Sequence, residues 1–364
     1  MDAHTLIEEY RGLRPQYEAF TASLDALVRT LLNAAGIEFF AVEPRTKSLE
    51  SFDGKIVRED KAGKYRTAVD VTDLSGVRII AYLQEDCDRI ETLIKDSFQV
   101  DSENSVRKED ELDPDKFGYL STHYVVGFAA ERLKLLEFSR FRGMKAEIQI
   151  RTLLQHTWAA IDWKFRYKEE QEAPKSLRRR LFRISALLEA ADNEFSAVNT
   201  AINELRERYS QDISKGDLRI NLNSESLRTF VAESRTAQEI IRIAQVAGVR
   251  LSPKHEGEAP YRSLISVAGT MEIETLHQLD AALERALPRA REFFELVVKK
   301  RSEEEGELRT PQLFGAAMLR MVLVLVAPED KFGHLVSGVN FAPTYAEALR
   351  ELRTQSNVRR KKAS

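Results

Sequence analysis

The chain has 364 residues, of which 43% are hydrophobic and 31% are charged, and its formal net charge at neutral pH is -3. This length exceeds what one hydrophobic core usually organises, so we expect two domains, or one domain with long helical extensions. The net charge is too small to argue for a generic affinity for nucleic acids or membranes, so each cluster of cations has to be assessed locally.

The cellular setting follows from three features of the sequence. A single cysteine, Cys87, excludes an internal disulfide framework and a cysteine-based zinc site. The N-terminus lacks a basic region followed by an apolar one, so we expect no signal peptide. The longest apolar run, residues 313–327, is short for a membrane span and contains Arg320. These features predict a cytoplasmic protein without a membrane segment.

The first predicted element is a helix over residues 6–31, because apolar residues recur there at steps of three and four. Pro15 lies inside this stripe, so the helix is expected to kink or to restart there, and Gly36 ends it. Such a regular stripe usually packs against the protein's own core. It can also pair with the same helix of a second subunit, which keeps a homo-oligomer open.

Between residues 43 and 66 the composition turns polar and basic. A charge run of this kind is usually a solvated surface. It is also what a phosphate cradle requires, because each Lys and Arg side chain donates several charge-assisted hydrogen bonds. Composition alone leaves both interpretations open. The cations are Arg45, Lys47, Lys55, Arg58, Lys61, Lys64 and Arg66.

Three segments then have the composition of strands. Residues 77–82 form an apolar run rich in β-branched side chains, which is typical of a central strand, and residues 124–128 form a second strand. Residues 145–152 alternate between apolar and polar side chains. Because successive strand residues point to opposite faces, Glu147 and Arg151 share one face with the amide of Gln149.

The segments around these strands complete the predicted core. Residues 86–98 have the spacing of a helix, and the acidic residues 100–115 are predicted to form a loop. Thr152 is the expected N-cap of an amphipathic helix that follows the last strand. Strand, helix, loop, strand and strand together indicate an α/β core.

The C-terminal half is predicted to be mostly helical. An apolar stripe over residues 184–209 indicates a long helix, which is also able to pair between subunits. Asn223 and Thr310 mark helix starts further on, and Pro288 is expected to kink one of the later helices. The basic C-terminal end is expected to be disordered.

Two acidic residues, Asp73 and Glu147, stand at the ends of predicted strands and meet if those strands are neighbours. Mg²⁺ prefers a few carboxylates, several waters and substrate phosphates. The sequence has no Gly-x-x-x-x-Gly-Lys loop, so side chains would have to hold the phosphates of a nucleotide. The residues alone therefore predict a metal-dependent site of the nucleotidyl-transfer type.

Four motifs occur in order between residues 40 and 170. They are Arg45-x-Lys47-x-x-x-Ser51-x-x-x-Lys55, Asp73-Leu-Ser-Gly76-Val-Arg78, Gly118-Tyr119-x-Ser121-x-His123 and Glu147-Ile-Gln-Ile-Arg-Thr152. Together they resemble the synthetase domain of RelA/SpoT-type alarmone synthetases. The resemblance implies an α/β (α+β) fold with a nucleotidyltransferase-like mixed sheet flanked by helices. It also implies a GTP pyrophosphokinase, which transfers the β,γ-pyrophosphate of ATP to the 3′-hydroxyl of GDP or GTP and yields (p)ppGpp and AMP.

Carried over position by position, the resemblance implies a role for each matching residue. Asp73 would hold Mg²⁺, with Mn²⁺ as a substitute, and Glu147 would bind the metal, deprotonate the attacking hydroxyl, or do both. Arg78 would stack on the adenine of ATP, and Tyr119 on the base of the acceptor. The ATP phosphates are assigned to Arg45, Lys47, Ser51 and Lys55, and the rest of the acceptor side to His123, Gln149 and Arg151.

The chain departs from the family pattern at the acceptor loop. Phe117, Leu120 and Thr122 stand at its variable places, so fewer polar groups are available to read a guanine edge. Residues 162–163 are Asp-Trp where the family commonly has Glu-His. No His-Asp dipeptide accompanies the six histidines, which implies that the hydrolase domain of long bifunctional relatives is absent.

Two alternatives therefore stay open. Toxic relatives pyrophosphorylate the 3′ end of tRNA, and the altered acceptor loop and the basic residues 178–183 permit that activity, with the C-terminal half as a restraint or sensor. The other alternative is a catalytically silent protein that binds nucleotides or partners, against which the intact Asp73 and Glu147 argue. The sequence does not identify a ligand or protein partner for the C-terminal half.

The expected organisation has four parts. The resemblance covers the second part, and the helical C-terminal half lies outside it. The parts are an N-terminal helix packed on the core (1–36), a RelA/SpoT-like pyrophosphokinase domain (37–170), a long connecting helix (171–215) and a helical C-terminal domain that is a candidate regulator (216–364).

Overall fold

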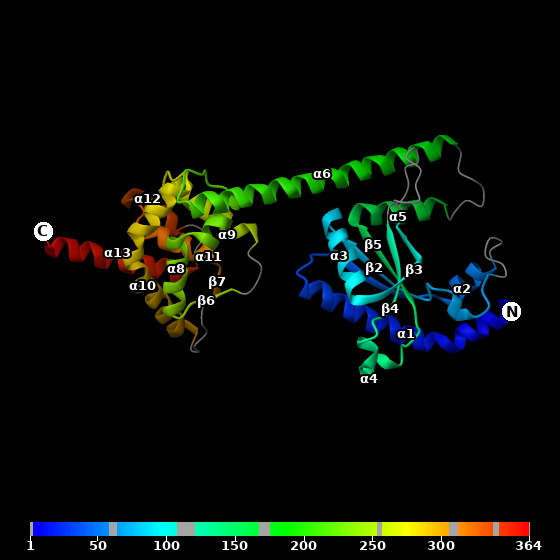
Figure 1. Ribbon diagram of the computed structural model, residues 1–364. Coiled ribbons are helices and arrows are strands. Elements are labelled where there is room, and N and C mark those ends of the chain that lie inside the picture. The colour runs from blue at the N-terminus through cyan, green and yellow to red at the C-terminus, as the bar shows by residue number, and fades with distance from the viewer. Residues whose placement is uncertain are drawn as a thin grey trace. The chain divides into compact units, whose positions relative to one another are not determined.

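The computed structural model describes residues 3–57, 64–107, 121–166, 175–252, 257–305, 312–337 and 342–363 (Figure 1). The chain divides into two compact units, residues 1–199 and 200–364, and each is described by itself. One helix, α6 (Lys175–Ser214), contributes residues to both units. The finer division into four parts stays a prediction.

A five-stranded mixed sheet is the centre of the first unit, with strand order β1-β2-β5-β4-β3 (Figure 1). The central strands β2 and β5 are parallel, and every other neighbouring pair is antiparallel. The predicted mixed sheet with flanking helices is therefore confirmed. The strands are β1 (Ala41–Thr46), β2 (Ser75–Ala81), β3 (Phe98–Arg107), β4 (Thr122–Phe128) and β5 (Ala146–Thr152).

Both edge strands differ from the sequence-based expectation. The loop predicted for residues 100–115 is wrong up to residue 107, where β3 pairs with β4, and residues 108–120 lie outside the described part. The acidic side chains of β3 suit a sheet edge, because charge there blocks pairing with other chains. At the opposite edge, β1 contains Pro44, which an edge strand tolerates because one of its sides needs no ladder hydrogen bonds.

Two helices cover the apolar face of the sheet. Helices α1 (Ala3–Ala34) and α3 (Gln84–Ser97) share a core with Val77, Ile79 and Ile148 of the central strands. The apolar stripe predicted for residues 6–31 supplies the α1 side of this core. Helix α1 passes through Pro15 as one element, so the predicted restart does not occur. The shorter elements of the unit are α2 (Leu49–Ile56), η2 (Ala68–Asp70), η3 (Arg132–Lys134) and α4 (Leu136–Ser139).

The end of β5 ties two further helices to the sheet. Helix α5 (Leu153–Arg166) follows β5 directly, and the Thr152 hydroxyl accepts a hydrogen bond from the Gln155 backbone N–H at 3.1 Å, which confirms the predicted N-cap. The same hydroxyl donates to the buried Asp192 of α6 at 2.6 Å. Ser196 of α6 donates to Glu85 at 3.0 Å. Helix α6 is thus held to this unit by polar side chains.

The second unit is a helical domain with its own hydrophobic core. Helix α11 (Gly315–Val324) is buried almost throughout and contacts α7, α8, α9, α10 and α12. A Cβ on Gly315 would lie 2.8 Å from the Val231 side chain, so only glycine permits this close approach. The other elements are α7 (Ser224–Glu233), α8 (Arg235–Val246), α9 (Glu258–Thr270), α10 (Leu276–Glu305), α12 (Glu329–Ser337), α13 (Pro343–Ala363) and the paired strands β6 (Arg250–Leu251) and β7 (Gln312–Leu313).

The predicted helical character of this half is confirmed. Asn223 caps α7 by accepting from the Ser226 backbone N–H at 2.8 Å, as the sequence indicated, whereas Thr310 lies outside the described residues. Pro288 lies inside the continuous helix α10. The apolar run around Arg320 forms α11 in the core of the unit. Within the described ranges, no helix combines the length and apolarity that a bilayer crossing needs.

The contact between Thr152 and Asp192 gives a first prediction. Burial raises the pKa of Asp192 above its ordinary value, although the Thr152 hydroxyl opposes this shift. A carboxyl group whose pKa is higher in the folded state costs stability as the pH rises through that pKa, because folding retains a proton that the unfolded chain releases. Asp192→Asn removes this cost and keeps an acceptor for Thr152.

We therefore expect the free energy of unfolding of Asp192→Asn, relative to wild type, to rise by about 1 kcal/mol between about pH 4 and pH 7. Urea unfolding followed by circular dichroism measures it. A variant that loses stability relative to wild type over this range would contradict the prediction.

Candidate functional site

The polar face of the sheet is organised by strand register. Arg45 of β1 pairs with Gly76 of β2, and Gly76 pairs with Glu147 of β5. Because Gly76 has no side chain, no side chain of β2 stands between Arg45 and Glu147 on this face of the sheet. A Cβ at Gly76 would already lie 3.4 Å from the Glu147 carbonyl oxygen.

The next row of the same face carries four polar side chains side by side. Glu43 pairs with Arg78, Arg78 with Gln149, and Gln149 with His123. Arg78 Nη1 donates to Glu43 at 2.9 Å, and its Nε donates to the Gln149 amide oxygen at 3.3 Å. These contacts fix the guanidinium plane of Arg78 between two strands. Glu43 was not among the predicted site residues, because the sequence alone does not show that it pairs with Arg78 on the neighbouring strand.

Asp73 lies just before β2 and binds two ammonium groups. Lys47 Nζ is 2.9 Å from Asp73 Oδ2, and Lys55 Nζ is 2.8 Å from Oδ1. Burial alone would raise the pKa of Asp73, but the charges and hydrogen bonds of the two lysines outweigh it and hold the pKa below its usual value. Asp73 is therefore ionised at neutral pH.

Glu147 at the start of β5 is held by a different pair of partners. His123 Nδ1 lies 3.1 Å from Oε1, and the Gln149 amide donates to Oε2 at 2.7 Å. Burial opposes ionisation, but hydrogen bonds and charge from His123, together with the Gln149 amide, lower the pKa of Glu147. An ionised Glu147 accepts the Nδ1 proton of His123, and the other ring nitrogen, Nε2, lies 2.8 Å from the Ser121 hydroxyl.

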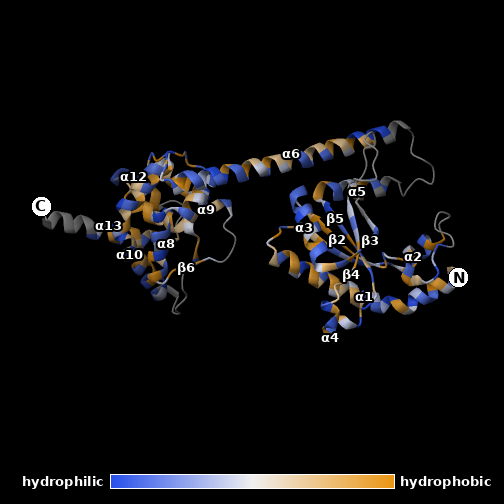
Figure 2. Cartoon of the chain, in the orientation of Figure 1, coloured by the Kyte–Doolittle hydropathy of each residue, from blue (hydrophilic) through white to orange (hydrophobic). Residues whose placement is uncertain are grey.

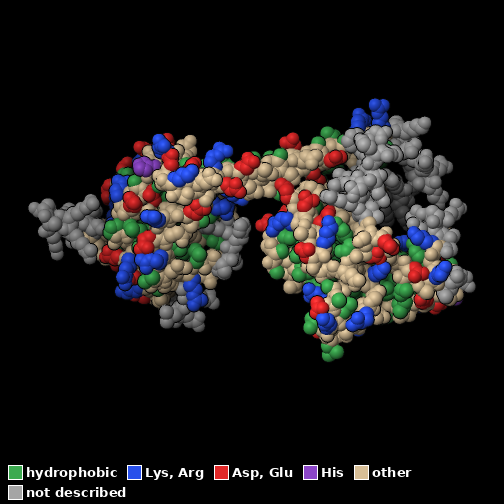
Figure 3. Space-filling view, in the orientation of Figure 1, with side chains coloured by type: hydrophobic (Ala, Val, Ile, Leu, Met, Phe, Trp, Pro, Cys, Tyr) green, Lys and Arg blue, Asp and Glu red, His purple; other side chains and the backbone are tan. Residues whose placement is uncertain are grey.

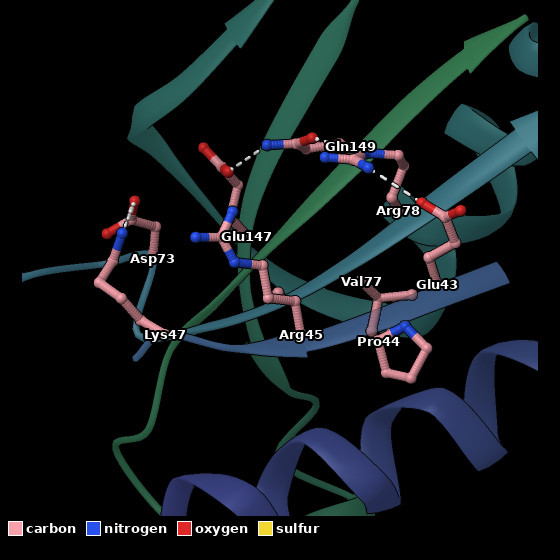
Figure 4. Close-up of a pocket in the computed structure, with 10 residues that line it drawn as sticks. Glu43, Pro44, Arg45, Lys47, Asp73, Val77, Arg78, Glu147 and Gln149 are labelled. Atoms are coloured by element: carbon pink, nitrogen blue, oxygen red, sulfur yellow. Dashed lines mark hydrogen bonds and ion pairs between the residues drawn. The ribbon is translucent and has the colours of Figure 1, made fainter. Parts of the chain in front are cut away.

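Asp73 and Glu147 line one cavity of about 320 Å³ (Figure 4). Figure 4 shows the Asp73–Lys47 pair on one side of it and the Arg78–Glu43 pair on the other, with the Arg45 side chain rising from β1 between them. The structure therefore brings the two predicted carboxylates to one face of one sheet. The remaining lining residues are Pro44, Gly76, Val77 and Gln149.

A second cavity of about 780 Å³ adjoins the first and shares Arg45, Arg78 and Gln149 with it. The buried Arg151 and the His123 ring line it from the sheet, and α5 adds His156, Ala159, Ala160 and Lys164. The ring nitrogen Nδ1 of His156 is buried and has no hydrogen-bond partner among the described residues. His156 and Lys164 were missed by sequence reasoning, although a period of four along α5 would have grouped His156 with Ala160 and Lys164.

Three predicted site residues have other placements. Lys55 does not line the first cavity and reaches it only through its ion pair with Asp73. The Ser51 hydroxyl accepts a hydrogen bond from Ser48 at 3.0 Å at the start of α2, and Ser51 is absent from the walls of both cavities. Tyr119 lies outside the described residues.

Helix α1 supports the cation side of the site from below. The Tyr10 hydroxyl donates to the Lys47 carbonyl oxygen at 2.6 Å, and burial raises the pKa of Tyr10 to about 12, so the hydroxyl keeps its proton. The Tyr10 ring packs on Phe52 of α2 with centroids 4.6 Å apart. Tyr10 thereby links Lys47, the residue that follows β1, to the helix that carries Lys55.

The donor set of the first cavity fits a hard divalent cation. Asp73 and Glu147 both have lowered pKa values, and the negative charge of Asp73 acts against ionisation of Glu147. A cation between them would relieve that repulsion. No set of three or more His, Cys, Asp or Glu side chains suited to a metal occurs in the described part of the chain. Mg²⁺ fits such a site, because it commonly takes one or two carboxylates and completes its shell with water and substrate phosphates.

Comparisons with known proteins concern the same part of the chain. Residues 44–172 match the family model described as "Region found in RelA / SpoT proteins". Two proteins of Bacillus subtilis (strain 168) are similar over this part: GTP pyrophosphokinase YwaC, 30% identical over 135 residues, and GTP pyrophosphokinase YjbM, 28% identical over 142 residues. The matches cover 36% and 38% of this chain and 60% and 63% of those proteins.

Solved structures with a similar fold include two small alarmone synthetases from Bacillus subtilis. Synthetase 1 is 24% identical with a TM-score of 0.44, and the match covers 53% of this chain and 97% of that one. Synthetase 2 is 22% identical with a TM-score of 0.45, and the match covers 53% and 99%. The match to the RelA/SpoT region lies within the N-terminal half of the chain, and the C-terminal region outside it is mostly helical.

The contact between Tyr10 and Lys47 gives a second prediction. Tyr10→Phe removes the hydroxyl that holds the Lys47 carbonyl but keeps the ring on Phe52, so we expect a loss of about 1 kcal/mol in the free energy of unfolding. Because Lys47 is then less well positioned, binding of inorganic triphosphate should weaken as well. Urea unfolding and titration calorimetry measure the two effects.

Tyr17→Phe is the matched control, because Tyr17 is also buried on α1 and its hydroxyl makes no hydrogen bond within the described ranges. If the two variants bind triphosphate equally, Tyr10 has no positioning role.

Proposed function

Since residues 44–172 are a RelA/SpoT region, we propose that this chain is a Mg²⁺-dependent pyrophosphokinase. It transfers the β,γ-pyrophosphate of ATP to the 3′-hydroxyl of GDP or GTP. The acceptor oxygen forms a bond to the β-phosphorus, the bond between the β-phosphorus and the oxygen bridging to the α-phosphorus breaks, and AMP leaves. Support comes from the names of the two similar Bacillus subtilis proteins, which are GTP pyrophosphokinases, and from the chemistry of the first cavity.

One observation carries the proposal: Asp73 and Glu147 line the same cavity with Arg45 and Lys47. A bound Mg²⁺ would neutralise charge on the triphosphate and orient it for attack. Arg45, Lys47 and Lys55 neutralise the remaining phosphate charge, which spreads over the oxygens during transfer. The guanidinium of Arg78, held flat by Glu43 and Gln149, offers a plane on which adenine can stack.

The acceptor lies on the side of His123 in this mechanism. The low pKa of Glu147 makes it a good anionic ligand but a weak base, since a base works best when its pKa is near the operating pH. His123 Nε2 lies 2.8 Å from the Ser121 hydroxyl, and a neutral His123 ring can take the proton of an acceptor hydroxyl in the place of Ser121. The pair of His123 and Glu147 then shares the proton that the hydroxyl releases.

The third prediction tests the reaction. We expect purified protein with Mg²⁺, GDP or GTP, and ATP labelled on its γ-phosphate to form a labelled guanosine tetra- or pentaphosphate together with unlabelled AMP. Asp73→Asn and Glu147→Gln should each lower the rate by roughly 100-fold or more, because each removes charge that stabilises the transferred group. Thin-layer chromatography and mass spectrometry identify the products.

The control for these variants is Asp53→Asn, because Asp53 is an exposed carboxylate on α2 away from both cavities. A tRNA with a free 3′ end is offered in a parallel reaction. If the label appears on tRNA alone, tRNA is the acceptor in place of the guanine nucleotide. If the label is transferred to neither acceptor, the result supports a catalytically silent protein.

The fourth prediction concerns the second cavity, which we assign to the acceptor. His156 and Lys164 are the donors that α5 adds there, so Lys164→Met and His156→Phe should raise the KM for GDP or GTP several-fold and leave the KM for ATP unchanged. Steady-state kinetics with each substrate varied in turn measures both values. Lys134→Met, an exposed lysine paired with Glu131, serves as the control. A rise in the KM for ATP alone would place the acceptor elsewhere.

A further inference from the structure

A buried carboxylate on α3 has no part in the proposed chemistry. It belongs to Glu91, and the helix around it consists mainly of hydrophilic residues (Figure 2). The other acidic side chains of α3 are at least partly exposed, as is usual on a surface where Asp and Glu mix with Lys and Arg (Figure 3). Glu91 is only 5% exposed. Because burying a carboxylate is costly unless hydrogen bonds satisfy it, the partners of Glu91 indicate its role.

Both carboxylate oxygens of Glu91 accept hydrogen bonds from strand β4. The Thr122 hydroxyl donates to Oε1 at 2.6 Å, and the Tyr124 hydroxyl donates to Oε2 at 2.9 Å. Burial raises the pKa of Tyr124, so its hydroxyl remains a donor. The Lys95 ammonium group, one turn further along α3, lies 3.8 Å from Oε2 and 5.4 Å from the centre of the Tyr124 ring. Glu91 thus links α3 to two residues of one strand, and Lys95 supplies a compensating charge.

These two residues stand immediately before and after His123. Because successive strand residues point to opposite faces, Thr122 and Tyr124 face α3, whereas His123 lines the second cavity. Glu91 therefore holds β4 from behind, on both sides of the histidine. The Thr122 hydroxyl, which stands at a variable place of the acceptor-loop motif, is engaged on this reverse face and is not directed to the acceptor.

The pairing of β4 with β3 is irregular at this point. The register passes from Asp101 opposite Val125 to Val106 opposite His123, so residues 102–105 of β3 stand against Tyr124 alone. The Val125 backbone N–H donates to the hydroxyl of Ser105 at 3.0 Å. A bulge of this kind interrupts the ladder that would otherwise fix a strand. On its other edge β4 pairs with β5 without a shift. Beside His123 the strand is thus held regularly along one edge only, and α3 supports it from its reverse face.

We propose that Glu91 is a positioning residue for His123. By holding Thr122 and Tyr124, it sets the place at which the His123 ring meets Glu147, 3.1 Å away. This inference rests on the proposed function, in which His123 takes the proton of the acceptor hydroxyl. Proton transfer requires a heavy-atom distance of about 2.6–3.2 Å, so a small displacement of β4 would interrupt it.

The fifth prediction removes the two hydroxyl groups one at a time. Tyr124→Phe and Thr122→Val keep the shape of each side chain. Each should lower kcat roughly tenfold and leave the KM for ATP unchanged, because the His123 ring is misplaced and the phosphate-binding cations are not. Glu91→Gln should lose less than Glu91→Met, because an amide can still bond to both hydroxyls.

The control for this series is Asp96→Asn, because Asp96 is an exposed carboxylate on the same helix. Steady-state kinetics with each substrate varied in turn measures all variants, and the control should match wild type. Wild-type kcat in Tyr124→Phe, Thr122→Val and Glu91→Met would overturn the proposal.

A double-mutant cycle separates positioning from a general effect on the fold. In a His123→Gln background, Tyr124→Phe should cause little further loss of kcat, because the group that it positions is already gone. Urea unfolding checks that each variant is folded. An equal fold-loss with and without His123 would show that Tyr124 acts on the structure in general, and would overturn the proposal.

A spectroscopic test does not depend on turnover. Nitrogen NMR of protein labelled at histidine reports which ring nitrogen carries the proton. The wild-type His123 signal, identified by its loss in His123→Gln, should show the proton on Nδ1, where Glu147 accepts it. Tyr124→Phe and Thr122→Val should shift this signal towards a mixture of the two tautomers.

The outcomes of the NMR test and of the transfer assay are distinguishable. An unchanged His123 signal in both variants would overturn the positioning role, whatever reaction the protein catalyses. A protein that shows the shift but transfers no pyrophosphate would contradict the proposed function and still support the positioning of the ring by Glu91.

Discussion

The candidate site depends on the register that places Gly76 between Arg45 and Glu147. Three neighbouring strands would ordinarily fill one face with three side chains, and a side chain at the middle position would separate the outer two. Glycine leaves that position open, so a cation-bearing residue and a carboxylate share one cavity. A slip of one residue between β2 and β5 would turn Arg78 or Gln149 to the other face and destroy the arrangement.

Each carboxylate in this cavity is kept charged in its own way. Asp73 relies on two full positive charges, Lys47 and Lys55, that come from the segment before β2 in the sequence. Glu147 relies on neighbours along its own sheet, the His123 ring and the Gln149 amide. Asp73 is thus kept charged by cations, whereas Glu147 is kept charged mainly by hydrogen bonds from its own sheet.

Much of this architecture was accessible from the sequence because local patterns encoded it. The alternation in β5 and the apolar run of β2 identified the central strands, and the spacing of α1 identified the helix below them. The edge strands were not accessible: β1 contains Pro44, and β3 is acidic, so neither has the composition of a buried strand. The contacts of Glu43 and His156 depend on pairing between distant segments, which no local pattern reports. For helix α6 the apolar stripe was recognised from its spacing, but spacing does not show which side of a helix is buried. In the structure large apolar side chains of this stripe are exposed, and Asp192 is buried.

The position of Asp192 has a practical consequence for dissecting the protein. The sequence similarity to the RelA/SpoT region ends at residue 172, whereas the compact unit continues to residue 199. A fragment trimmed to the region of similarity would discard the carboxylate that receives the Thr152 hydroxyl and the serine that donates to Glu85. Truncation at the family boundary would thus loosen the junction between β5 and α5. A loss of activity or stability in such a fragment would then come from these missing contacts, and it would be no evidence that the C-terminal half regulates the protein.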